Sequence, residues 1–176
     1  MSFNRDRATA FVVALAVTVA VLVAGQLAWH KYAVAKPLDA GLREIPGVTA
    51  ASWQEAKNGD VVINVTLGGV ENLAVTHGDI ETAAKNILGR RPSRIILTDT
   101  RTPELDDLYY AVHYHIQEAI AAGNFAAMAG QINTQAAARG VQAKIYVDAR
   151  AVYLQLAKDG ADLYAVVPRE APREVK

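Results

Sequence analysis

The segment from Val48 to Leu67, VTAASWQEAKNGDVVINVTL, contains two extended runs on either side of a turn. Asn58-Gly59 between two such runs is a strong signal for a β-hairpin with a two-residue turn. That turn fixes which residues pair, and side chains then alternate between two faces. Trp53 is expected on the outer face. The expected core face contains Ala50, Ser52, Gln54, Ala56, Val61, Ile63, Val65 and Leu67.

A short helical segment is predicted before the hairpin, because Pro37 suits the first turn of a helix and Pro46-Gly47 stops it. The run Leu42-Arg43-Glu44-Ile45-Pro46-Gly47-Val48, followed by Ala50 and the hairpin, resembles the small α/β ring-building modules of bacterial secretion and sporulation membrane complexes. The resemblance covers about residues 38–67. It implies an anchored subunit that packs side by side with copies of itself.

The rest of the chain alternates between helical and extended patterns. Capping residues and glycines give the helix ends, and Asp159-Gly160 predicts a turn between the last two strands. The predicted fold is α+β in the order α-β-β-α-β-α-α-β-β-β, with one mixed sheet and helices mainly on one face. The expected elements are a helix at 77–88 capped by Thr76, a short buried strand at 94–98, a helix from Pro103 to Ala122, a helix from Phe125 to Arg139, and strands near 143–147, 152–156 and 162–167.

The composition excludes several kinds of function. Lysine plus arginine and aspartate plus glutamate are equal at 18 each, so no overall field attracts nucleic acid. The absence of cysteine removes disulfides, thiolate metal sites and a cysteine nucleophile. The common hydrolase, metalloprotease and nucleotide-binding signatures are also missing. No nucleic-acid partner and no cofactor are therefore expected, and the balance favours a protein that is not an enzyme.

An apolar stretch lies near the N-terminus, with no charge from Ala8 to Trp29. As a helix it spans roughly 33 Å, which matches the hydrocarbon core of a bilayer. Residues 8–30 are therefore predicted to form a single transmembrane helix with the lipid bilayer as partner. Cleavage as a signal peptide is the other interpretation, because Ala33-Val34-Ala35 resembles a cleavage site.

The membrane prediction divides the remaining chain. Residues 1–7 form a short polar segment, 31–47 a juxtamembrane segment with the short helix, 48–168 the α+β domain, and 169–176 a disordered tail. Arg5 and Arg7 favour the N-terminal segment inside the cell. The expected location is the cell membrane, with the domain outside the cytoplasm.

Within the predicted span, small side chains recur every four residues at Ala16, Ala20, Ala24 and Ala28. This spacing places them along one stripe of a helix, where a second helix packs closely. A homo-oligomer or another envelope protein is therefore an expected partner. The alternative is chance, since so alanine-rich a segment produces this spacing without selection.

Polar groups gather where the strand at 94–98 ends and the next helix begins. Asp99, Arg101 and Asp106 lie there, at a place where ligands often bind, and with His113 they are the candidate catalytic residues. The structural interpretation is that Thr102 caps the helix, that the acidic residues favour the positive end of its dipole, and that Asp99 pairs with Arg101.

His113 and His115 are two positions apart and point about 200° from each other on a helix, which weakens a metal site made of both. His115 and Glu118 lie within one turn and are the weak metal-binding candidates.

The sequence supports two hypotheses about function. The first is a membrane-anchored, non-enzymatic interaction or assembly domain that self-associates in the cell envelope. The alternative is an anchored enzyme or small-ligand or metal-binding domain that uses residues 99–107 with His113 and His115.

Overall fold

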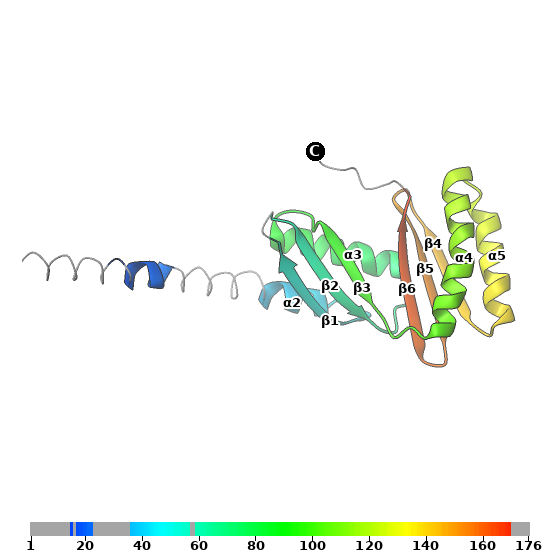
Figure 1. The fold of residues 1–176 in the computed structure, drawn as a ribbon, viewed down its shortest axis with the longest axis horizontal. Coiled ribbons are helices and arrows are strands. Elements are labelled where there is room, and N and C mark those ends of the chain that lie inside the picture. Colours follow the sequence, from blue (N-terminus) through cyan, green and yellow to red (C-terminus); the bar gives the residue numbers. More distant parts are fainter. Residues whose placement is uncertain (1–14, 16, 23–35, 57–58, 170–176) are drawn as a thin grey trace, which may run out of the picture.

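The structure is a computed structural model that describes residues 15, 17–22, 36–56 and 59–169. The chain has an α+β fold, and its elements follow the predicted order α-β-β-α-β-α-α-β-β-β (Figure 1). They are α2 (Lys36–Arg43), β1 (Val48–Glu55), β2 (Val61–Leu67), α3 (Leu73–Leu88), β3 (Arg94–Thr98), α4 (Pro103–Ala122), α5 (Phe125–Ala138), β4 (Gln142–Val147), β5 (Ala151–Lys158) and β6 (Ala161–Pro168).

The strands form two sheets, so the prediction of one mixed sheet is wrong. In the sheet β1-β2-β3, β1 is antiparallel and β3 parallel to β2, whereas β4-β5-β6 is antiparallel throughout. Between the two sheets, side chains that follow β3 bind outward N–H groups of β6. The N–H of Asp162 donates to the hydroxyl of Thr100, and that of Tyr164 donates to the carboxylate of Asp99.

The register of the first hairpin differs from the prediction by one residue. The N–H of Ala56 donates to the carbonyl of Asp60 at 2.8 Å, so the turn contains three residues instead of two. Gly59 closes it with a φ of 83°, as expected for the last residue of a three-residue turn. The slip moves the side chains from Ala50 to Glu55 to the other face, whereas a bulge between Val48 and Ala50 keeps Val48 in the core. Trp53 therefore lies opposite Ile63 and packs against the core.

The sheet β1-β2-β3 is covered on one face by α2 and α3. Apolar side chains from these elements form one core. The face of β2 that points into this core is the face that the sequence predicted to be buried. This core also receives residues of the second sheet. Its members include Leu38, Leu42, Ile63, Val65, Leu67, Leu73, Ile80, Ala151, Tyr153 and Tyr164.

A second core lies between α4, α5 and the other face of the sheet β4-β5-β6 (Figure 1). Its members include Leu105, Leu108, Val112, Ile116, Met128, Ile132, Val152, Leu154, Leu156 and Leu163. Successive residues of β5 thus point into different cores, since side chains alternate along a strand. This explains why β5 is buried from Ala151 to Leu156.

Local capping signals place the helix ends. Thr102 caps α4 and Pro103 is its first residue, as predicted. By contrast, α3 begins at Leu73 because the side chain of Asn72 accepts hydrogen bonds from the next turn. The predicted cap, Thr76, is instead a buried residue within the helix.

Strand β3 lies at the edge of its sheet, so the prediction of a buried strand is wrong. It pairs only with β2, and Arg94, Ile96 and Thr98 are exposed on the outer face of the sheet. Only Ile95 and Leu97 point towards the core.

The two sheets are joined by polar contacts to the loop before α3. The buried side chain of Gln155 accepts a hydrogen bond from the N–H of Leu73 at 2.9 Å and donates to the carbonyl of Val70 at 2.8 Å. The hydroxyl of Tyr164 accepts from the N–H of Val70 at 3.1 Å. Backbone groups that would be unsatisfied in the interior are thereby paired.

Most of the predicted membrane span lies outside the described residues. Of it, residues 15 and 17–22 are helical. Among the described residues, no helix is both long and apolar enough to cross a membrane. Of the four regularly spaced alanines, only Ala20 is described, and it is exposed. At the other end, Arg169 donates to the carbonyls of Arg150 and Asp148, and residues 170–176 lie outside the described part.

Candidate functional site

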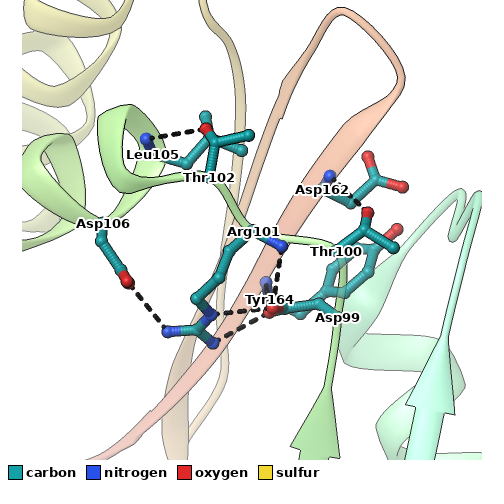
Figure 2. Close-up of polar contacts among 8 residues, drawn as sticks. All are labelled: Asp99, Thr100, Arg101, Thr102, Leu105, Asp106, Asp162 and Tyr164. Atoms are coloured by element: carbon teal, nitrogen blue, oxygen red, sulfur yellow. Dashed lines mark hydrogen bonds and ion pairs between the residues drawn. The ribbon is translucent and has the colours of Figure 1, made fainter.

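The polar segment after β3 is organised around the carboxylate of Asp99 (Figure 2). The side chain of Asp99 is only 2% exposed. Nε of Arg101 donates to Oδ1 at 2.7 Å, and Nη2 donates to Oδ2 at 2.9 Å. The N–H of Tyr164 on β6 donates to Oδ2 at 2.8 Å. Both carboxylate oxygens are therefore occupied by donors of the chain itself.

Arg101 extends this arrangement to the first turn of α4. Its Nη1 donates to Oδ1 of Asp106 at 3.1 Å, while the hydroxyl of Thr102 accepts from the N–H of Leu105 (Figure 2). The hydrogen bond with Asp99 raises the pKa of Arg101 above its usual range, although burial acts in the opposite direction. The structure thus brings together Asp99, Arg101 and Asp106, as the sequence suggested.

The geometry of this group favours a structural role. A general acid or base needs a group within hydrogen-bond reach of a substrate proton. Here the Asp99 oxygens bind Arg101 and the edge of β6, and Asp106 is turned towards Arg101. The group as it stands caps α4 and holds β6 against the end of β3. A catalytic use of these residues stays a prediction.

The two histidines of α4 are held apart. His113 lies on the side of α4 that carries Tyr109, with ring centroids 5.4 Å apart, and its Nε2 is 3.2 Å from Nε2 of Gln117. His115 faces α5, where its Nε2 is 2.9 Å from Nε2 of Gln135. The structure therefore does not bring His113 to His115 or to Asp99.

The weak metal-binding pair is also not assembled. His115 interacts with Gln135 of α5, and it forms no ion pair with Glu118 among the described residues. Within the part of the chain that the structure describes, no group of three or more histidines and acidic residues is positioned to hold a metal ion.

An unusual surface lies on the outer side of α4 and α5. Tyr110 and Tyr114 of α4 are 69% and 76% exposed. Helix α5, FAAMAGQINTQAAA, carries no charged residue although half of it faces outwards. A shallow hollow between the helices is lined by His115, Ala127, Gly130, Gln131, Thr134 and Gln135. We call Tyr110, Tyr114 and the residues of this hollow the α4–α5 surface.

Sequence reasoning missed the role of Gln155. Its position between Leu154 and Leu156 indicated a polar, solvent-facing side of a strand, but that side is covered by the loop before α3. No local signal distinguishes a glutamine exposed to water from one that pairs buried backbone groups, because the difference depends on a segment more than 80 positions away.

Comparison of the chain with models of protein families, with curated proteins and with solved structures finds no match.

Proposed function

We propose that the chain is a membrane-anchored, non-enzymatic interaction domain that self-associates in the bacterial cell envelope, with the domain outside the cytoplasm. The observation that carries the proposal is the α4–α5 surface. Protein interfaces are enriched in tyrosine and depleted in charge at their centres, whereas ordinary surfaces mix both signs of charge. The two exposed tyrosines of α4 and the uncharged helix α5 fit the first description, although exposed Asp107 and Glu118 flank the tyrosines along α4.

The N-terminal helix supports the anchoring part of the proposal. Its described apolar residues are between 51% and 67% exposed, so nothing in the described chain covers them. These residues are Leu15, Val17, Val19, Val21 and Leu22. A run of uncovered apolar side chains is stable only in contact with lipid or with another protein.

The occupied polar groups support the non-enzymatic part. Asp99, Arg101 and Asp106 bind one another and the backbone, and His113 and His115 lie on different sides of α4. The same residues explain local folding without a substrate.

The proposal is tested by the mass of the full chain in detergent, measured by light scattering over micromolar concentrations. We expect an oligomer, and we expect Tyr110→Asp with Tyr114→Asp to shift it towards the monomer. Val75→Asp is the matched control, because Val75 is also exposed, at 57%, but lies on α3. A wild-type monomer throughout, or an equal effect of the control, contradicts self-association through this surface.

A further inference from the structure

The outer side of α4 carries two tyrosines between two carboxylates. Asp107, Tyr110, Tyr114 and Glu118 follow one another at spacings of three, four and four residues, so they lie along one face of the helix. All four are exposed, and this face is opposite the one that packs into the second core. Neither carboxylate forms an ion pair with another described residue. We call these four residues the α4 stripe.

The α4 stripe has no cation of its own. Helix α4 contains no lysine or arginine, and α5 contains no charged residue. The carbonyl of Arg139, which follows α5, accepts from Lys158 at 2.9 Å. Because Lys158 also binds Glu104, Arg139 lies near the first turn of α4 and not beside Glu118. The stripe therefore keeps unpaired negative charge.

The opposite end of the domain has the opposite charge. The loop from α3 to β3 lies at the end away from α4 and α5 (Figure 1). Three exposed cations there form no ion pair with another described residue. The acidic side chains of this end are already bound, Glu55 by Arg90 and Asp60 by Ser93. We call the three cations the basic end: Lys85 in the last turn of α3, Arg91 in the loop, and Arg94 at the start of β3 on the outer face of the sheet.

The charges of the α4 stripe disfavour a contact of the stripe with itself. A two-fold axis brings the same surface of two copies together. If α4 packs along α4 of a second copy, carboxylates face carboxylates in both the parallel and the antiparallel orientation, because Asp107 and Glu118 lie at the two ends of the stripe. Like charges across an interface oppose association. The stripe therefore fits a basic partner better than it fits a second stripe.

We propose that the α4 stripe of one copy binds the basic end of the next copy, so that the chain associates end to end. This inference rests on the self-association proposed above and names its two faces. Because the faces differ and lie at opposite ends of the domain, the contact is heterologous, and each copy keeps one free face after it has bound a neighbour. Copies then add in one direction into a row or a closed ring, and they do not stop at a two-fold dimer.

The side chains of the two faces suit each other. A guanidinium group stacks on an aromatic ring and pairs with a carboxylate at the same time. The rings of Tyr110 and Tyr114 are 69% and 76% exposed, so Arg91 and Arg94 of a second copy can reach them. Tyrosine and arginine are also enriched in protein interfaces. The complementary charges determine which ends meet.

The test measures the mass of the full chain in detergent by light scattering for two charge-reversed variants. Arg91→Glu with Arg94→Glu reverses the basic end, and Asp107→Lys with Glu118→Lys reverses the α4 stripe. We expect each variant alone to associate at least about tenfold more weakly than the wild type, because like charges then face each other. An equimolar mixture of the two variants should regain association, because each face then meets a face of opposite charge.

A third variant controls for net charge. Glu44→Lys with Asp79→Lys changes the net charge as much as the reversal of the α4 stripe does, but at exposed residues outside both faces. We expect this control to associate like the wild type. Thermal unfolding of each variant checks that the fold is kept, and association in the mixture provides a second check.

The outcomes separate this inference from the self-association proposed above. A wild-type chain that is monomeric at every concentration overturns both. If the wild type associates but Arg91→Glu with Arg94→Glu leaves its mass unchanged, the basic end is not a contact face, and only the end-to-end arrangement is wrong. The same conclusion holds if the mixture of the two variants stays dissociated, or if the control dissociates as much as they do.

Discussion

The backbone N–H of Tyr164 donates to the carboxylate of Asp99 at 2.8 Å, across 65 positions of the sequence. Tyr164 lies on the outer strand of its sheet, and an unpaired strand edge is a template for unwanted pairing. Thr100 and Asp99 together cover two N–H groups of this edge. A polar loop that resembled a catalytic site in the sequence thus closes the edge of a sheet.

This arrangement predicts a large effect of Arg101→Met on stability. The change leaves the Asp99 carboxylate, which is 2% exposed, without its charged partner. We expect a loss of about 1–3 kcal/mol in the free energy of unfolding, measured in urea. Arg90→Met is the control, because the Arg90–Glu55 pair is exposed and is expected to contribute less than about 1 kcal/mol. Equal effects of the two changes would contradict a structural role of Arg101.

Replacing Gln155 tests the joint between the sheets. In Gln155→Leu, the N–H of Leu73 and the carbonyl of Val70 lose their partners in the interior. Each unsatisfied group costs about 1–3 kcal/mol, so urea unfolding should show a loss of roughly 2–6 kcal/mol. Gln54→Leu on the exposed face of β1 should leave stability nearly unchanged. A Gln155→Leu protein as stable as the wild type would mean that these hydrogen bonds contribute little.

The hairpin register is tested by moving one charge along β1. Ala51 lies opposite Val65 and packs against the core, whereas Ser52 lies opposite Asn64 and is exposed. Ala51→Asp should therefore cost at least about 2 kcal/mol, because it brings a carboxylate to the core face. Ser52→Asp should change stability by less than about 0.5 kcal/mol. The register expected from a two-residue turn predicts the reverse order, so thermal unfolding of the two variants decides between them.

His77 predicts a pH dependence of stability. Burial lowers the pKa of His77 in the folded chain, helped by Arg150 and opposed by Glu81 and Asp148. The unfolded chain therefore binds more protons between the folded pKa and the usual 6.5, and stability falls as the pH drops through this window. We expect His77→Gln to have a flatter dependence of the melting temperature on pH between about pH 5 and about pH 7. Parallel curves for both proteins would show that His77 does not contribute.

The predicted alanine stripe is tested by Ala20→Ile with Ala24→Ile in the full chain. Isoleucine keeps the segment apolar but holds two helix backbones further apart. Insertion into membranes should survive, and association measured by light scattering in detergent should fall. If the mass stays the same while Tyr110→Asp with Tyr114→Asp lowers it, the contact lies in the domain and not in the span.

The element order was predictable because its signals are local. Thr102-Pro103 starts α4 and Gly123 ends it by the backbone conformation it adopts, whatever the rest of the chain does. Asp159-Gly160 forms the turn between β5 and β6, with a φ of 50° and 81° at the two residues. Signals of this kind require only neighbouring residues.

The missed features depend on distant contacts. The sequence around Gly59 is compatible with a turn of either two or three residues. The three-residue turn is the one that places Trp53 against the core. The contacts of the Asp99 and Thr100 side chains with β6 join residues more than 60 positions apart. For the candidate site, the pairing of Asp99 with Arg101 followed from proximity in sequence. The hydrogen bond from the N–H of Tyr164 to Asp99 did not follow from proximity, because the two residues are 65 positions apart in the sequence.

The double burial of β5 has a consequence for the chain during synthesis. Ala151, Tyr153 and Tyr164 complete the core that α2 and α3 begin, so the ribosome must produce nearly the whole chain before this core closes. Until then, the nascent first sheet exposes the apolar surface that Tyr153 and Tyr164 later cover. Exposed surfaces of this kind make incomplete chains prone to aggregation. We therefore expect chains that end before β5 and β6 to aggregate more readily than the complete chain.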